Sequence, residues 1–169
     1  MKTIKKTMYL VMIFTAVLFT ACSTSDDDND DGDDGGNSGG SEFVTAKING
    51  ASFEAAQSPA VIVAATSGND LLTFHGGNNE GNTLRGSIFN YTGVGTYTTG
   101  DNITNVNSLS YITLPANMWT STFDIGTGTL TVTSDDGTTV EGTFSFEGYN
   151  ASDQTTKTIT EGKFKATID

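Results

Sequence analysis

Four residue types are scarce in this chain of 169 residues, which has one cysteine, one histidine, one tryptophan and two prolines. A single cysteine excludes an intrachain disulfide framework and a zinc site built from several thiolates. Lysine and arginine number 8 against 20 acidic residues, a formal net charge of −12. Nucleic-acid binders need a basic face to neutralise phosphates, so this balance argues against them. We therefore expect no disulfide, no metal, no cofactor and no nucleic-acid partner.

The N-terminus has the pattern of an export signal. Three lysines among the first six residues precede an apolar run from Met8 to Ala21. The run of about 14 residues is shorter than the roughly 20 that a membrane-spanning helix needs, and is typical of a secretory signal. The stretch Leu18-Phe19-Thr20-Ala21-Cys22 resembles a bacterial lipobox, with its leucine one position further from the cysteine than is common. We expect residues 1–21 to be a lipoprotein signal peptide and Cys22 to carry a lipid anchor that binds a membrane.

A polar segment follows the cysteine. Residues 23–42 contain aspartate, glycine, serine and asparagine without an apolar side chain, so residues 22–42 are expected to be the lipidated cysteine and a disordered tether. Asp27-x-Asn29-x-Asp31-Gly32 matches the first half of a calcium loop, but Ser38 stands where the closing glutamate is required. A serine followed by an acidic run also resembles the surface-export signal of Bacteroidota lipoproteins. We expect an outer-membrane protein that faces the exterior; a simple solvated spacer explains the charge equally well.

From residue 43 onward the composition changes. Short runs of valine, isoleucine, phenylalanine and threonine alternate with glycine, asparagine, aspartate and serine. This pattern predicts that residues 43–169 form one all-β domain, an antiparallel β-sandwich or barrel of about eight or nine strands.

Side-chain parity predicts three details of this domain. Asn49-Gly50 is a favoured pair for a type I′ hairpin turn. A three-residue loop over 135–137 would pair Val132 with Val140, and would keep their apolar side chains on one face. A bulge near Glu161-Gly162 would return the apolar residues of the last strand to a common face.

Several short stretches resemble a group of uncharacterised Bacteroidota lipoproteins. They are Ala46-Lys-Ile-Asn-Gly-Ala-Ser-Phe53, Gly95-Thr-Tyr-Thr-Thr-Gly100, Gly128-Thr-Leu-Thr-Val-Thr133, Gly142-Thr-Phe-Ser-Phe146 and Thr160-Glu-Gly-Lys-Phe164. The resemblance covers essentially the whole mature chain. It implies a β-rich domain of unknown function behind a lipobox, and it brings no catalytic residues.

The chain has few groups for catalysis. His75 is the single histidine, so either a metal site or a hydrolase triad would have to use it. Ordinary hydrogen bonding at a strand end is the favoured interpretation. Glu141 and Glu147 lie six residues apart on one strand, roughly 20 Å at the strand rise. Glycosidase carboxylates lie about 5–10 Å apart, so this pair does not fit such a site. We predict no catalytic residue.

The aromatic residues offer a binding hypothesis. Trp119, next to Asn117 in the loop-like stretch 115–120, has the largest apolar face available for stacking on a sugar. The alternative is that the ring seals the core. The domain from residue 43 has 12 acidic and 5 basic side chains, a net charge of −7, so its ligand should be neutral or cationic, or bridged by a divalent cation.

The sequence thus favours a surface-tethered, non-enzymatic binding or structural module, with a neutral glycan or an envelope protein as partner. An extracellular hydrolase, or an accessory subunit acting on a polymer, is the alternative.

Overall fold

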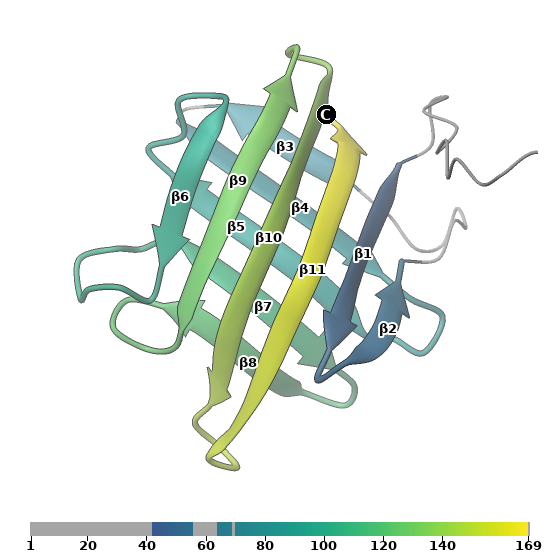
Figure 1. The fold of residues 1–169 in the computed structure, drawn as a ribbon, viewed down its shortest axis with the longest axis vertical. Coiled ribbons are helices and arrows are strands. Elements are labelled where there is room, and N and C mark those ends of the chain that lie inside the picture. The colour runs from purple at the N-terminus through teal and green to yellow at the C-terminus, as the bar shows by residue number, and fades with distance from the viewer. Residues whose placement is uncertain (1–41, 56–63, 69, 169) are drawn as a thin grey trace, which may run out of the picture. The chain divides into compact units, whose positions relative to one another are not determined.

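The computed structural model describes residues 42–55, 64–68 and 70–168 (Figure 1). These residues form antiparallel strands and no helix, which confirms the predicted all-β class. The strands are β1 (Phe43–Ile48), β2 (Ala51–Glu54), β3 (Ala64–Gly68), β4 (Leu71–Gly77), β5 (Thr83–Phe89), β6 (Gly95–Thr99), β7 (Ser108–Thr113), β8 (Asn117–Thr122), β9 (Thr127–Asp135), β10 (Thr139–Asn150) and β11 (Thr155–Thr167). Eleven strands are described, and one of them, β8, includes residues 117–120 of the stretch 115–120 that was expected to be loop-like.

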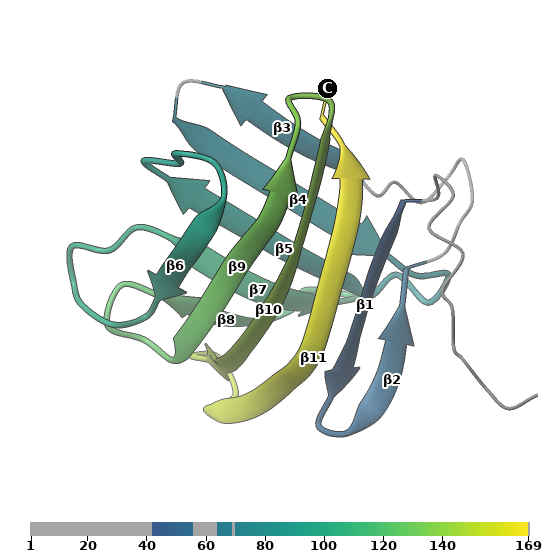
Figure 2. The same ribbon diagram turned by 45° about the horizontal axis from the view of Figure 1, so that its top comes forward.

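The strands lie in two layers that cross obliquely (Figures 1 and 2). The front sheet has the order β6-β9-β10-β11-β1-β2, and the back sheet has the order β8-β7-β5-β4-β3. The layers are joined at the far end of the long strand β10, where Tyr149 pairs with Thr120 of β8. The result is a sandwich that is nearly closed into a barrel, so both predicted architectures apply.

The core fills the space between the two sheets. Phe74 of the back sheet stacks on Phe164 of the front sheet, with ring centroids 4.1 Å apart and planes inclined by 6°. Two glycines make room for these rings: a Cβ on Gly86 would overlap Phe74, and one on Gly142 would lie 2.6 Å from Phe164. Since no larger residue fits beneath either ring, the glycines are part of the packing.

The predicted turn at Asn49-Gly50 is confirmed, because both residues have positive φ (49° and 86°), as a type I′ turn requires. The predicted bulge in the last strand is also confirmed. The β10–β11 register shifts between Phe144 and Phe146, and Glu161 at the extra position has φ 53°. The bulge lets Ile159 and Phe164 both face the core despite their opposite parity.

The predicted register of the β9–β10 hairpin is wrong. Val140 pairs with Asp135 rather than with Val132, and a bulge in β9 absorbs the difference. The loop between the two strands covers residues 136–138, one position later than predicted. There the Asp136 carboxylate accepts hydrogen bonds from the backbone N–H groups of Thr138 and Thr139 at 2.9 and 2.7 Å. Both valines still point into the core, as the parity argument required.

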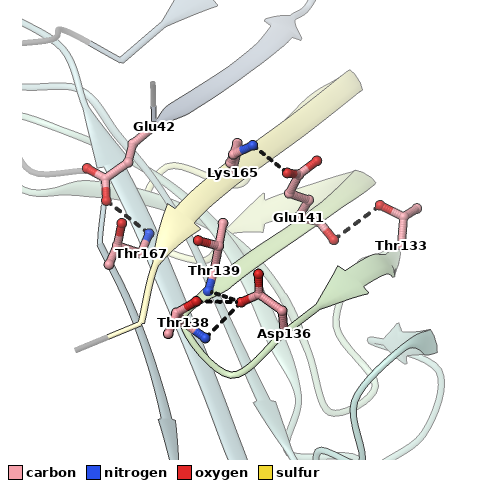
Figure 3. Close-up of polar contacts among 8 residues, drawn as sticks. All are labelled: Glu42, Thr133, Asp136, Thr138, Thr139, Glu141, Lys165 and Thr167. Atoms are coloured by element: carbon pink, nitrogen blue, oxygen red, sulfur yellow. Dashed lines mark hydrogen bonds and ion pairs between the residues drawn. The ribbon is translucent and has the colours of Figure 1, made fainter. Parts of the chain in front are cut away.

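The first described residue lies beside the end of the last strand (Figure 3). Glu42 accepts a hydrogen bond from the Thr167 backbone N–H at 2.9 Å, and on the same sheet Lys165 forms an ion pair with Glu141 at 2.6 Å. The preceding chain therefore joins the domain at the end of the front sheet that also carries the β9–β10 hairpin.

The expected signal peptide, Cys22 and all of the expected tether except Glu42 lie outside the described residues. Within residues 42–55, 64–68 and 70–168, no helix is long and apolar enough to cross a membrane.

Candidate functional site

Trp119 lies in β8 and is buried, with 7 % of its surface exposed. Its Nε1–H donates to the Thr155 hydroxyl at 2.8 Å, and Lys157 Nζ lies 4.5 Å from the centre of the ring. Asn117 is exposed at the beginning of the strand and pairs with Thr113. A role for Trp119 and Asn117 in binding stays a prediction. The buried indole ring of Trp119 has the environment of a core residue.

His75 lies on the outer side of the back sheet, paired across the strands with Arg85. A hydrolase triad needs a carboxylate to orient its histidine, and here a cation stands in the neighbouring place. Among the described residues, no group of three or more histidine, cysteine, aspartate or glutamate side chains could hold a metal ion.

The outer side of the front sheet carries an ordered set of hydroxyl groups, which we call the hydroxyl face. On adjacent strands β6, β9 and β10, one row is formed by Thr96, Thr131 and Thr143, and the next row by Thr98, Thr129 and Ser145. Strand geometry places neighbours in a row about 4.8 Å apart and the two rows about 6.8 Å apart. Five of the six side chains are exposed and Thr131 is partly exposed. The hydroxyl face is therefore a regular, uncharged surface.

Three shallow depressions follow one another across this side of the sheet. The first, about 430 Å³, and the second, about 510 Å³, share Thr129 and Ser145 in their walls. The second and a third, about 310 Å³, share Glu161 and Lys163. Because consecutive depressions share walls, they form one open groove that begins near Asp101 and runs from β6 toward β2.

The charged side chains of this groove lie mostly in its two outer depressions. The first has Asp101 and Glu147 in its wall, and the third has Glu54 and the ion pair of Lys47 with Glu161, 2.8 Å long. The middle depression has one anion, Glu161, and one cation, Lys163, so its charges balance although the domain as a whole is acidic.

At the beginning of the groove, Asp101 is held in its ionised form. Its carboxylate accepts hydrogen bonds from the Thr98 hydroxyl at 2.7 Å and from Asn105 Nδ2 at 2.7 Å. These bonds, that of Thr98 first, lower the pKa of Asp101 below its ordinary value. Asp101 is thus a fixed anion and an acceptor, and is unsuited to give up a proton as a general acid.

The sequence carries a signal for the hydroxyl face in its alternating threonines. Thr127, Thr129, Thr131 and Thr133 alternate along β9, so all four point to one side of a strand. The alternation does not predict which strands pair with β9. The rows exist because β6 and β10 place their own hydroxyls opposite those of β9.

Residues 41–167 match a family described as a domain of unknown function, DUF6252. No curated protein and no solved structure gave a match.

Proposed function

Since the chain belongs to the DUF6252 family, whose function is unknown, we propose its function from its own surface: a non-enzymatic binding module, held at the cell envelope by a lipid on Cys22. Its proposed ligand is a neutral, hydroxyl-rich polymer, a glycan, bound along the groove on the outer side of the front sheet. The observation that carries this proposal is the pair of in-register hydroxyl rows on β6, β9 and β10.

The chemistry of the hydroxyl face favours a neutral glycan. A threonine or serine hydroxyl can donate one hydrogen bond and accept others, as sugar hydroxyls do. Thr98 already donates to Asp101, so it would act toward a ligand as an acceptor. The adjacent methyl groups of threonine offer small apolar contacts to sugar C–H groups. The hydroxyl rows themselves contain no charged side chain, and the net acidity of the domain repels anionic polymers.

The same chemistry favours a polymer over a single sugar. A hydrogen bond exchanged with water contributes only about 0.5–1.5 kcal/mol, so one sugar on this open surface would bind weakly. A chain that lies along three connected depressions adds such contacts without new losses of translational freedom. We therefore expect affinity to rise with the number of sugar units.

The binding proposal is tested with the mature chain carrying Cys22→Ser, which keeps it soluble, on an array of neutral and acidic glycans of graded length. Thr129→Val and Thr143→Val remove hydroxyls from the two rows while they keep shape and strand preference. We expect the double variant to lose binding by tenfold or more. Thr73→Val, on the outer side of the back sheet, is the matched control and should bind as the wild type.

Two results would oppose the binding proposal. Equal binding by the double variant would place the ligand elsewhere. Turnover of a glycan by the wild type would favour the hydrolase alternative instead.

The envelope address has its own test. The wild type should incorporate a palmitate analogue in growing cells, because the lipobox-like stretch ends at the single cysteine. Labelling that persists in Cys22→Ser would remove the anchor from the proposal.

A further inference from the structure

Four large apolar side chains are exposed on two neighbouring loops, and we call them the apolar tip. Ile103 and Val106 lie between β6 and β7, with 66 % and 41 % of their surfaces exposed, and Phe123 and Ile125 lie between β8 and β9, each 40 % exposed. The two loops are bonded to each other, because Phe123 accepts from Asn102 N–H at 3.1 Å and donates to Asn105 at 3.0 Å through its backbone. The tip is one surface built from two loops.

The base of the tip is rigid. Thr99 and Ser121, which are 1 % and 0 % exposed, share a hydrogen bond of 2.6 Å that links the edge of the front sheet to the back sheet. Above them, Asn105 Nδ2 donates to the Thr98 carbonyl at 2.9 Å and to Asp101 at 2.7 Å. A surface held in this way loses little conformational freedom when it binds.

Phe123 has a backbone conformation that bulky residues rarely adopt, with φ 53°. Such a conformation costs on the order of 1 kcal/mol or more for a residue other than glycine, and the ring also remains partly in water. The two backbone hydrogen bonds to Asn102 and Asn105 hold this conformation and leave the ring 40 % exposed, where a contact could cover it.

The position and charge of the tip restrict what can cover it. Glu42, the first described residue, lies beside Thr167 at the opposite end of the front sheet from the two loops of the tip. Asp101 and Asp124 lie in the same two loops, and would be driven into any lipid surface together with the apolar groups. A second copy would bring another domain of net charge −7 against this one.

We propose that the apolar tip is a docking surface for a protein partner whose own surface has an apolar centre and a basic rim. The apolar centre would cover Ile103 and Phe123, and the rim would pair with Asp101 and Asp124. This inference goes beyond the proposed glycan binding. The tip adjoins the beginning of the groove at Asp101, but different substitutions test the two proposals. The failure of either proposal leaves the other standing.

The test places a photo-crosslinking amino acid in the full chain, expressed in the cells that make it, at Ile103 or at Phe123. The control position is Ala151, which is exposed in the β10–β11 turn at the same end of the front sheet. We expect one discrete protein adduct from both tip positions and none from Ala151. Ile103→Asp combined with the probe at 123, and Asp124→Lys combined with the probe at 103, should each lower the adduct by about tenfold or more.

Thermal unfolding of each variant separates lost docking from lost folding. Both variants should unfold at the temperature of the wild type, because both changed side chains are exposed. The proposal is overturned by an adduct with the mass of two copies of this chain, by adducts to lipid, by equal yields at Ala151, or by the lack of any adduct at the tip. If Asp124→Lys leaves the adduct yield unchanged, the partner has no basic rim that pairs with Asp124, and the proposed partner is wrong.

Discussion

Strand β10 shows two different surfaces on its two sides. On the inner side Phe144 and Phe146 are buried beside glycines that give the rings room, so nearly every atom is constrained by a neighbour. On the outer side Thr143 and Ser145 are exposed and form rows with the neighbouring strands. The inner residues hold the two sheets together, whereas the outer residues can change with little effect on the fold. This difference separates what determines the structure from what can recognise a ligand.

The largest effect is expected on the inner side. Phe164→Ala removes a ring that is 1 % exposed and stacked on Phe74, and should lower the free energy of unfolding by about 3–5 kcal/mol. Chemical denaturation measures the loss. Lys163→Ala, one residue earlier on the outer side, is the control and should change stability by less than about 0.5 kcal/mol. Similar losses for both would abolish the distinction between the two sides.

A slightly smaller loss is expected for Trp119→Ala. The change empties a buried site and leaves the Thr155 hydroxyl without its donor, so the free energy of unfolding should fall by about 3 kcal/mol. Denaturation of this variant, with Asn117→Ala as the exposed control on the same strand, distinguishes a core ring from a surface anchor. A stability equal to the wild type would return Trp119 to the binding surface.

An effect that depends on pH is expected at the β9–β10 loop. Hydrogen bonds from the Thr138 hydroxyl, and then from backbone N–H groups, lower the pKa of Asp136 below its ordinary value of 3.8. Its ionised form therefore stabilises the fold above that value, and this contribution disappears as the pH falls through the lowered pKa. Asp136→Asn should be less stable than the wild type near pH 6, and the difference should shrink in acid. Thermal unfolding from pH 2 to pH 7 measures it, and a difference independent of pH would contradict the assignment.

The smallest effects are expected for the outer ion pairs. Lys165→Met should destabilise more than Lys47→Met, because the Lys165–Glu141 pair is the less exposed of the two, and both losses should stay under about 1 kcal/mol. Both losses should decrease at high salt. The reverse order would show that burial does not set the strength of these pairs.

The sequence predicted the inner side better than the outer one. Parity and turn chemistry gave the Asn49-Gly50 turn and the bulge at Glu161, because each depends on neighbours a few residues away. The predicted β9–β10 register was wrong because the loop lies at residues 136–138 rather than 135–137, where the Asp136 carboxylate bonds the backbone of Thr138 and Thr139. Trp119 was assigned to a loop because Pro115 precedes it, while the pairing of β8 with β7 placed the ring in the core.

The hydroxyl face and the apolar tip could not be derived from local patterns. Thr131 meets Thr96 and Thr143 only after β6, β9 and β10 have paired, and those residues are 35 and 12 positions away. Ile103 and Phe123 likewise come together through the bonds between their loops. Surfaces of this kind depend on the tertiary arrangement, and exposed residues carry no periodic burial signal.

The pairing of β1 with β11 has a consequence for the order of folding. These strands lie side by side at opposite ends of the domain sequence, and the Glu42–Thr167 bond spans 125 residues. The first strand to leave the ribosome must therefore wait for the last, while the β10–β11 hairpin can form on its own from local contacts. The front sheet is completed only when the C-terminus is available, so a chain that lacks its final residues leaves β1 without its partner β11.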